Sequence, residues 1–362
     1  MSIPVIGDIE CLARELHAPV IAITGTNGKS TVTTLVGEMA KAAGLRVAVA
    51  GNIGTPVLDL LDDGIQYDLW VLELSSFQLD LTHSLTPIAS TILNVTPDHL
   101  DRHHTLKAYI KAKQQVYKQS GFLLYNRGDD WTFPDINKQD KPTIVTSFGL
   151  DAPTDTQWGI TTTADNIHYL AFGQTTLLSV DTMRIKGRHN WMNAMAACAL
   201  AHVAGIEYKF MIDVLQHFPG LPHRSQWLRA IDKVDWINDS KGTNIGATMS
   251  AISGIGGAMQ GKIILIAGGQ GKGADFNELR QSMADYVRSV VLIGEDADKI
   301  EYALKDVVHV LRAPSLDEAV ITAKLEAHPG DVVLLSPACA SLDMFRDFNH
   351  RGDVFAAAVD AL

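Results

Sequence analysis

Short apolar runs alternate with amphipathic stretches through the first half of the chain. Runs rich in β-branched residues predict strands at 19–23, 46–50, 69–74 and 89–95. Between the first two, residues 30–43 carry apolar side chains at helical spacing and are followed by Gly44, a residue favoured just beyond a helix. Strand and helix signals that alternate in this way predict a mostly parallel α/β sheet.

The middle of the chain has a different pattern. From 142 to 183, threonine and glutamine are more frequent and the alternation is strand-like, which predicts a small antiparallel addition to the same domain. Residues 190–204 are apolar nearly all round and predict a buried helix. Residues 218–222 hold two prolines and one glycine, so they form the candidate linker.

The α/β pattern returns after this linker. Strands are predicted at 234–238, 262–267, 290–293 and 332–335. Helical stretches lie between these strands and after the last of them. The sequence therefore predicts two α/β domains that join near residue 220.

Charge and composition narrow the class of protein. The chain of 362 residues has 30 Lys plus Arg against 41 Asp plus Glu, and its net charge of −11 argues against a nucleic-acid partner. Hydrophobic residues make up 46% of the chain, enough for a sizeable core, and no apolar run approaches a membrane-spanning length. The N-terminus lacks the basic start of a signal peptide, and the three cysteines show no metal or disulfide spacing. We expect a globular, cytoplasmic protein without membrane insertion.

The sharpest local signal is a glycine-rich loop between a predicted strand and a predicted helix. Its residues are Gly25, Thr26, Asn27, Gly28, Lys29, Ser30 and Thr31. Glycines let backbone N–H groups approach phosphate oxygens, Lys29 can reach the outer phosphates and the Ser30 hydroxyl can bind Mg²⁺. The spacing G-x-x-G-K-S is two residues shorter than the usual phosphate-loop pattern. Nucleotide binding is nevertheless favoured over an ordinary strand-to-helix turn.

Candidate metal ligands follow later strands. Glu73 ends an apolar run, where a carboxylate needs a cation or hydrogen-bond donors, so metal ligation is favoured over a buried salt bridge. His99 stands beyond another predicted strand, where a metal ligand would be placed. We interpret His103 and His104 as part of a solvated loop. On pattern alone, nearby lysines form an exposed helix face: Lys107, Lys111, Lys113 and Lys118.

Seven separated motifs occur in one order along the chain. They are TGTNGKST (24–31), LELSSFQL (72–79), NVTPDHLDR (94–102), GRHN (187–190), LPHR (221–224), INDSKGTN (237–244) and LSPACASLD (335–343). The set resembles the Mur ligase family of peptidoglycan synthesis. The elements SSFQL and SPACAS resemble those members of the family that add D-glutamate. The resemblance covers nearly the whole chain.

The resemblance implies an α/β fold with a P-loop-type, mostly parallel ATPase domain followed by a second, Rossmann-like α/β domain. It implies an ATP-dependent ligase that acts as a monomer on UDP-N-acetylmuramoyl-L-alanine and D-glutamate, with Mg²⁺ as a cofactor. ATP phosphorylates the terminal carboxylate of the acceptor, and the amino group of D-glutamate attacks the resulting acyl phosphate. Phosphorylation supplies the leaving group that a carboxylate lacks, while Mg²⁺ and cationic side chains stabilise the oxyanions.

The resemblance also implies roles for residues that match the family motifs. The catalytic residues are Lys29, Glu73, His99 and Lys113, and Lys113 matches a lysine that becomes carbamylated. The magnesium ligands are Ser30, Glu73, His99 and Lys113. Nucleotide contacts beyond the loop are Asn193, His223, Arg224 and Asp239. The residues that face the acceptor are Asn52 and Ser75. The D-glutamate pocket is formed by Lys241, Thr243, Lys272, Ser341, Leu342 and Phe348.

Members of the family usually begin with a further domain that holds the UDP group. Here the resemblance starts near residues 4–10, so we expect a remnant of that domain at 1–17, an ATP-binding domain at 18–220 and an amino-acid-binding domain at 221–362. Without UDP contacts, acceptor binding is expected to be weaker. Two alternatives stay open: a nucleotide-binding but catalytically incomplete fragment, and another acid–amino-acid ligase of the Mur or folylpolyglutamate synthase type.

Overall fold

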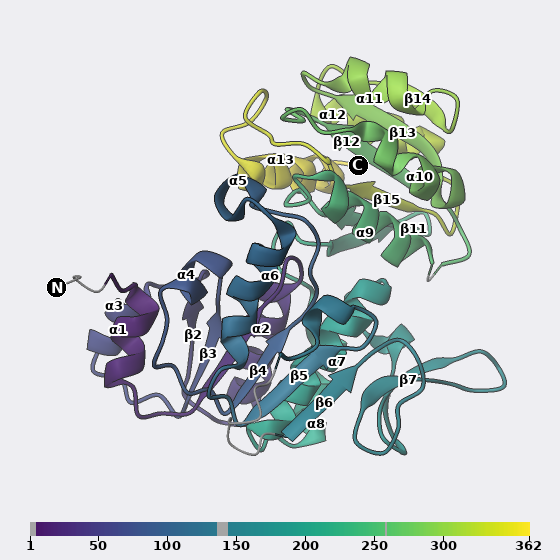
Figure 1. The fold of residues 1–362 in the computed structure, drawn as a ribbon. Coiled ribbons are helices and arrows are strands. Elements are labelled where there is room, and N and C mark those ends of the chain that lie inside the picture. Colours follow the sequence, from purple (N-terminus) through teal and green to yellow (C-terminus); the bar gives the residue numbers. More distant parts are fainter. Residues whose placement is uncertain (1–4, 136–143, 258) are drawn as a thin grey trace. The chain divides into compact units, whose positions relative to one another are not determined.

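The structure is a computed structural model that describes residues 5–135, 144–257 and 259–362. Two expectations begin outside the described residues: the resemblance that starts at residue 4 and the strand-like segment that starts at 142. The chain divides into two compact units, one of residues 1–183 and 191–218, the other of residues 184–190 and 219–362 (Figure 1). One division thus falls at the start of the proline-containing segment 218–222.

The first unit is built on a nine-stranded sheet with the order β2-β3-β1-β4-β5-β6-β7-β8-β9. Its strands are β1 (Val20–Thr24), β2 (Val47–Gly51), β3 (Leu69–Glu73), β4 (Ala89–Ile92), β5 (Phe122–Asn126), β6 (Ile144–Phe148), β7 (Trp158–Thr162), β8 (His168–Phe172) and β9 (Thr175–Ser179). The strands from β2 to β6 in this order pair in parallel. The four strands predicted in the first half of the chain are therefore confirmed, as is the mostly parallel α/β class.

The segment predicted as an antiparallel addition is antiparallel only in part. β7 pairs antiparallel with β8, and β8 pairs antiparallel with β9, as expected. β6, however, pairs in parallel with β5, so the prediction is wrong for this strand. Side-chain alternation identifies a strand, but the direction of pairing depends on the connection between strands, which alternation does not describe.

The helices of the first unit pack around this sheet (Figure 1). They are α1 (Asp8–Glu15), α2 (Lys29–Ala42), α3 (Val57–Asp62), α4 (Ser76–Asp80), α5 (Leu100–His103), α6 (Leu106–Gln114), α7 (Arg188–Val203) and α8 (Tyr208–His217). The helix predicted at 30–43 is α2. The helix predicted at 190–204 is α7, and its residues 194–201 are all buried, which confirms that expectation.

The carboxyl ends of β1, β3 and β4 meet at one edge of the sheet, because these strands are parallel neighbours. Every residue of β1, β3 and β4 is buried, so the sheet holds these ends firmly. The glycine-rich loop follows β1, Glu73 ends β3, and the segment that contains His99 follows β4. Ligands of open α/β sheets bind at such an edge. The fold therefore gathers the phosphate loop and two candidate metal ligands.

The second unit has a six-stranded sheet with the order β10-β11-β15-β12-β13-β14, parallel except for the β10–β11 pair. Its strands are β10 (Gln226–Ile231), β11 (Val234–Asn238), β12 (Ile263–Gly268), β13 (Val287–Ile293), β14 (His309–Arg312) and β15 (Val332–Leu335). Its helices are α9 (Ile245–Gly256), α10 (Arg280–Tyr286), α11 (Ala297–Leu304), α12 (Leu316–Glu326) and α13 (Phe348–Asp360). The four predicted strands are confirmed as β11, β12, β13 and β15.

The central strand β12 shows why these strands have continuous apolar sequences. Ile263, Leu265 and Ala267 belong to one buried cluster, to which α9, α10 and α11 contribute. Ile264 and Ile266 belong to a second cluster, to which α12 and α13 contribute. Because both faces of the strand are buried, apolar residues occupy consecutive positions and the usual alternation is lost.

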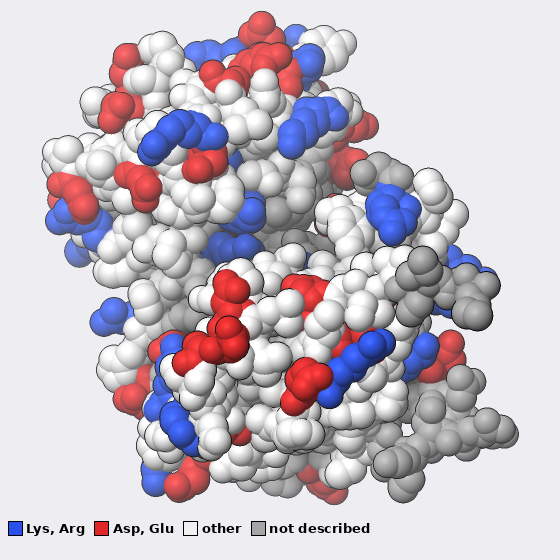
Figure 2. All heavy atoms as spheres, turned by 90° about the vertical axis from the view of Figure 1, so that its left-hand side faces the viewer, with Lys and Arg blue, Asp and Glu red and all other residues white. Residues whose placement is uncertain are grey.

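Charged side chains of both signs cover the face of the molecule drawn in Figure 2. Lys and Arg are interspersed there with Asp and Glu. The ion pairs between exposed side chains of the protein include Arg46 with Asp68 and Lys41 with Glu38. Such exposed pairs contribute little to stability. Within the described part of the chain, no helix is both long and apolar enough to cross a membrane.

Helix α1 packs on the first unit through buried Ile9 and Leu12, and one buried carboxylate adds polar contacts. Glu10 is 2% exposed and accepts hydrogen bonds from His83 N at 2.7 Å, Ser84 N at 3.0 Å and Ser84 Oγ at 2.9 Å. Arg14 Nε donates a further bond at 2.9 Å. Burial opposes ionisation, but these hydrogen bonds outweigh it and lower the pKa of Glu10 to about 2.

Replacement of Glu10 by glutamine is expected to lower the free energy of unfolding by about 2 kcal/mol at pH 7. The folded pKa lies below the ordinary value of 4.5, so this stabilisation is present above pH 4.5 and is lost as the pH falls towards 2. Urea unfolding at pH 7 and pH 3 measures both effects, with Glu15→Gln on the exposed side of α1 as the control. Equal stabilities of Glu10→Gln and the parent chain at pH 7 would contradict this account.

Candidate functional site

The phosphate loop runs from the end of β1 to the start of α2. Gly28 immediately precedes α2 and has a φ of 83°, in the left-handed region that favours glycine. A Cβ atom at Gly28 would lie 2.5 Å from Asn193 Oδ1. Both the conformation and this close approach therefore require glycine at residue 28. They also place Asn193, a predicted nucleotide contact, against the loop.

Asn94 holds the loop from the neighbouring strand end. Its Oδ1 accepts a hydrogen bond from Asn27 N at 2.8 Å, and its Nδ2 donates to Asn27 O at 3.0 Å. Its backbone oxygen accepts a bond from Thr26 N at 2.9 Å. Asn94 was missed as a functional candidate, although it is the first residue of the motif at 94–102.

Two lysines converge on one backbone carbonyl of the loop. Lys29 Nζ donates to Gly25 O and to Thr26 O, both at 2.9 Å. Lys113 Nζ donates to the same Gly25 O at 2.8 Å and lies 3.4 Å from Thr24 Oγ1. Two amino groups beside a glycine-rich loop that leads into the start of a helix suit a polyanionic ligand such as a triphosphate.

Lys113 is buried, with 1% of its surface exposed. The pattern-based prediction of an exposed helix face is correct for Lys107, Lys111 and Lys118 and wrong for Lys113. The physical reason is helical spacing: Tyr109, four residues earlier in α6, is also buried, so Lys113 extends from the side of α6 that packs on the unit.

The surroundings of Lys113 disfavour its charged form. Burial lowers the pKa of Lys113 to about 6, and the nearby charge of Lys29 acts in the same direction, while Asp98 and Glu73 oppose the shift. The amine is therefore mainly uncharged at neutral pH. An uncharged amine is a nucleophile that can add CO₂, and the resulting carbamate is an oxygen ligand for a metal ion.

Glu73 ends β3 as a buried carboxylate with 2% exposure. Its Oε1 accepts a hydrogen bond from Asn52 Nδ2 at 3.0 Å, while its Oε2 is buried without a partner in the described structure. Gly51 allows this approach, because a Cβ atom there would lie 2.2 Å from Glu73 O. A buried carboxylate oxygen without a donor is unfavourable, so Glu73 fits a divalent cation.

Of the other proposed metal ligands, His99 is partly exposed and Ser30 is buried. His99 has a φ of 51°, its side chain is about half exposed, and its Nε2 lies 3.6 Å from Asp98 Oδ2. Ser30 is buried at the start of α2. Across the described residues, no group of three or more His, Cys, Asp and Glu side chains could hold a metal ion. A site formed by Glu73 and His99 thus needs oxygen ligands of another kind, such as the Ser30 hydroxyl and a carbamate on Lys113.

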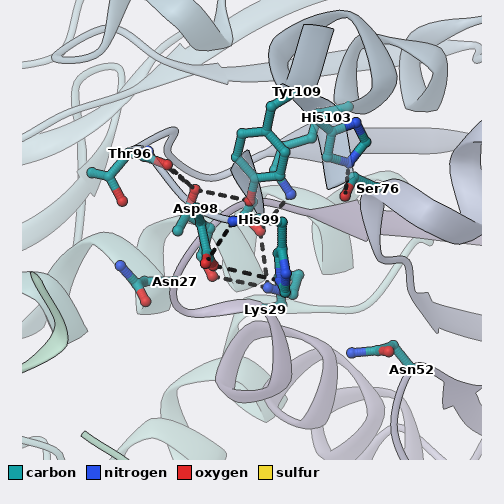
Figure 3. Close-up of polar contacts among 12 residues, drawn as sticks. Asn27, Lys29, Asn52, Ser76, Thr96, Asp98, His99, His103 and Tyr109 are labelled. Carbon is teal, nitrogen blue, oxygen red and sulfur yellow. Dashed lines mark hydrogen bonds and ion pairs between the residues drawn. The ribbon is translucent and has the colours of Figure 1, made fainter. Parts of the chain in front are cut away.

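His103 was interpreted as part of a solvated loop, and the structure corrects this. His103 is only 8% exposed, and its Nε2 lies 2.9 Å from Ser76 Oγ (Figure 3). Its ring also stacks on Phe77, with 5.6 Å between the ring centres. His104 is exposed, as predicted. No local sequence pattern indicates that residue 103 lies against residue 76.

The acceptor-facing candidates flank Glu73. Asn52 donates to the Glu73 carboxylate, as described above. Ser75 is the N-cap of α4: its Oγ accepts from Gln78 N at 3.2 Å, and Gln78 Oε1 accepts from Ser75 N at 3.1 Å. This capping box satisfies backbone donors at the helix start and fixes the turn after β3. The structure therefore brings Asn52, Glu73 and Ser75 to the same sheet edge.

Three predicted nucleotide contacts lie in the second unit. Asp239 follows β11, and its oxygens accept hydrogen bonds from Ser336 Oγ at 2.7 Å and Ser225 N at 3.0 Å. Burial raises the pKa of Asp239 to about 6, although these bonds and the charge of Arg224 oppose the shift. His223 is also buried, and burial lowers the pKa of its imidazole. Asn193, the fourth contact, belongs to the first unit.

The six residues predicted to bind D-glutamate all belong to the second unit. They lie in segments that follow β11, β12 and β15: Lys241, Thr243, Lys272, Ser341, Leu342 and Phe348. Lys241 Nζ lies 3.8 Å from the centre of the Phe348 ring, a cation–π contact that brings these two together. Ser341 is buried, whereas Lys272 and Leu342 are exposed.

A strand–loop–helix phosphate site on a mostly parallel sheet, with converging lysines and a buried carboxylate, defines a P-loop nucleotide-binding enzyme. Comparison with known proteins narrows this class. Residues 23–201 match the Mur ligase middle domain, and residues 223–339 match the Mur ligase glutamate ligase domain. The chain belongs to the Mur ligase family, whose members are ATP-dependent ligases.

Curated relatives resemble nearly the whole chain. A protein of Legionella pneumophila (strain Paris) is 69% identical over 356 residues, which cover 98% of this chain and 79% of the relative. A protein of Acinetobacter baylyi is 49% identical over 363 residues, which cover 99% of this chain and 80% of the relative. Both are named UDP-N-acetylmuramoylalanine--D-glutamate ligase.

Solved structures share the fold at lower identity. MurF ligase from Thermotoga maritima in complex with ADP has a TM-score of 0.68 and 17% identity, and the match covers 98% of this chain and 84% of that one. A UDP-N-acetylmuramoyl-L-alanyl-D-glutamate--2,6-diaminopimelate ligase has a TM-score of 0.68 and 20% identity, with coverage of 97% and 80%. These likenesses confirm the predicted fold, a P-loop ATPase domain followed by a second α/β domain.

Proposed function

We propose that this chain joins D-glutamate to UDP-N-acetylmuramoyl-L-alanine, with ATP as the phosphoryl donor, in peptidoglycan synthesis. The observation that carries the proposal is the convergence of Lys29 and Lys113 on Gly25 O, beside a buried Glu73 carboxylate with an unpaired oxygen. The names of the relatives at 69% and 49% identity support the choice of substrates.

The first unit supplies the groups for phosphoryl transfer. Lys29, the first residue of α2, would contact the outer phosphates, where its charge offsets the charge that develops during transfer. Asn52 and Ser75 would orient the acceptor carboxylate beside Glu73. In the second unit, Lys241, Thr243, Lys272 and Ser341 would bind the two carboxylates of D-glutamate. The amino group of D-glutamate then attacks the acyl phosphate and phosphate leaves.

Magnesium fits the residues of the first unit. Glu73 offers an unpaired carboxylate oxygen, Ser30 a hydroxyl, and His99 an imidazole that is about half exposed. Lys113 would join them as a carbamate, because Mg²⁺ binds oxygen ligands and the unmodified side chain offers none. Bound Mg²⁺ would supply charge neutralisation for the phosphates. Glu73 and carbamylated Lys113 would hold it, with Ser30 and His99 as further ligands.

The remaining parts of the proposal concern organisation. We infer an ATP-binding domain at 18–220 and an amino-acid-binding domain at 221–362. A monomer suffices, because one chain carries all the proposed nucleotide, acceptor and amino-acid contacts. The cytoplasm is the compartment that supplies ATP and nucleotide-linked sugars to such a reaction.

The test measures phosphate release with Mg²⁺, ATP and UDP-N-acetylmuramoyl-L-alanine, with and without D-glutamate. We expect D-glutamate to raise the rate at least about tenfold, because the acyl phosphate is consumed only when the amine attacks it. L-Glutamate and diaminopimelate serve as matched controls, and mass spectrometry identifies the amide. Release driven by another amino acid would indicate a different acid–amino-acid ligase. ATP binding without substrate-dependent release would indicate an incomplete fragment.

A further inference from the structure

A buried polar pair that has no assigned role joins two segments of the first unit. His103 Nε2 lies 2.9 Å from Ser76 Oγ, and these residues are 8% and 3% exposed (Figure 3). A buried imidazole or hydroxyl that loses its partner is unfavourable, so each group strongly favours the arrangement in which the other is present. The pair therefore specifies how the segment after β3 lies against the segment after β4.

His103, on α5, also contacts helices α4 and α6. It is the last residue of α5, and its ring stacks on Phe77 of α4 at 5.6 Å and contacts Tyr109 of α6 at 5.4 Å. Tyr109 in turn lies close to the phosphate loop, with its hydroxyl 3.3 Å from Thr26 Oγ1. Lys113 Nζ lies 4.5 Å from the centre of the Tyr109 ring. The imidazole thus contacts the helix that carries Lys113 directly and is linked to the loop through Tyr109.

Ser76 lies next to residues of the proposed site. It is the first residue of α4, directly after the N-cap Ser75 and three positions beyond Glu73. A displacement of the first turn of α4 would move both of these residues relative to the phosphate loop. Misplacement of reacting groups by about 1 Å can cost about 100-fold in rate. The hydrogen bond from Ser76 to His103 is therefore well placed to set catalytic geometry.

We propose that His103 is a positioning residue for the ligase reaction, which holds the start of α4 against α5 and α6 through Ser76. The inference rests on the proposed function of this site. Burial lowers the pKa of His103, while Asp80 opposes the shift and Arg102, His99 and Lys113 add to it, so the imidazole is uncharged near neutral pH. A neutral ring can keep both its hydrogen bond and its aromatic contacts.

The test compares His103→Phe, which keeps an aromatic ring but removes the hydrogen bond, with Ser76→Ala and the double variant. We expect His103→Phe to lower kcat about tenfold and to raise KM for the acceptor, while KM for ATP changes less than about twofold. The double variant should be no worse than the more affected single variant, because both remove the same interaction. His103→Gln, which can restore a hydrogen bond, should recover part of the activity.

Thermal unfolding separates positioning from folding, and Ser76→Ala serves if His103→Phe is unstable. The matched control is His83→Phe, an exposed histidine in the same unit, which should retain parent kinetics. Parent-like kcat and acceptor KM in an active His103→Phe enzyme would overturn this inference alone. Effects that add in the double variant would also overturn this inference. The same holds if KM for ATP rises as much as KM for the acceptor. A parent chain without D-glutamate-dependent product would overturn the proposed function and this inference together.

Discussion

Replacement of Lys29 by alanine is expected to lower phosphate release at least about 1000-fold, the scale at which removal of one preorganised charge donor acts. Lys29 Nζ donates hydrogen bonds to the backbone carbonyls of Gly25 and Thr26. Lys29 is the first residue of α2, where a triphosphate would be bound. Its charge is needed most when negative charge develops on the transferring phosphoryl group. The measurement is phosphate release with ATP, Mg²⁺, acceptor and D-glutamate at saturating concentrations.

The control for Lys29→Ala is Lys107→Ala, which removes an exposed lysine from α6 and should keep the parent rate. Thermal unfolding of both variants checks that the loss of activity is catalytic and does not come from a loss of folding. A Lys29→Ala chain that releases phosphate within about twofold of the parent rate would show that the loop is not the site of phosphoryl transfer.

The fold was largely predictable because its central strands are buried on both faces. β1, β3, β12 and β15 are nearly continuous apolar runs that end at turns, and no other element type fits such short runs between helical stretches. β10 and β14 were not predicted, because they lie at the edges of their sheet and are only partly buried. Polar or charged side chains also interrupt or border their apolar residues, with Arg229 inside β10 and His309 and Arg312 at the ends of β14.

The candidate site was predictable where one residue type is required by local chemistry. Gly28 is needed for a positive φ beside Asn193, and Lys29 and Ser30 follow it in the loop motif. Glu73 was identified because a carboxylate at the end of an apolar run needs compensation. In each of these cases, the neighbouring sequence explains why that residue type is needed at that position.

The remaining site residues depend on contacts between distant segments. Asn94 is functional because it lies beside Asn27, and His103 is buried because it lies against Ser76. Lys113 was misjudged from its pattern for the same reason, since its burial depends on how α6 packs beside the loop. No local pattern encodes these distances, so the resemblance to a family identified Lys113 when periodicity did not.

Replacement of Lys113 by methionine is expected to abolish the ligase reaction and to stabilise the fold. Activity should fall at least about 100-fold, because methionine cannot form a carbamate and supplies no oxygen ligand. The free energy of unfolding at pH 7.5 should rise by about 2 kcal/mol, because the folded chain no longer has to hold an amine away from water and protons. Urea unfolding in CO₂-free buffer measures the stability, and ¹³C-bicarbonate NMR reports the carbamate signal that the variant should lack.

The gain in stability from Lys113→Met is expected to decrease as the pH rises. The pKa of Lys113 is about 6 in the folded chain against an ordinary value of 10.5, so the unfolded chain binds more protons between these two values. The stability of the parent chain therefore rises with pH across this window, and the advantage of Lys113→Met should shrink between pH 7.5 and 9.5. Lys111→Met, at an exposed position of the same helix, should show neither effect. A Lys113→Met chain that is less stable than the parent by an amount that stays constant between pH 7.5 and 9.5 would mean that Lys113 is charged in the fold and cannot capture CO₂.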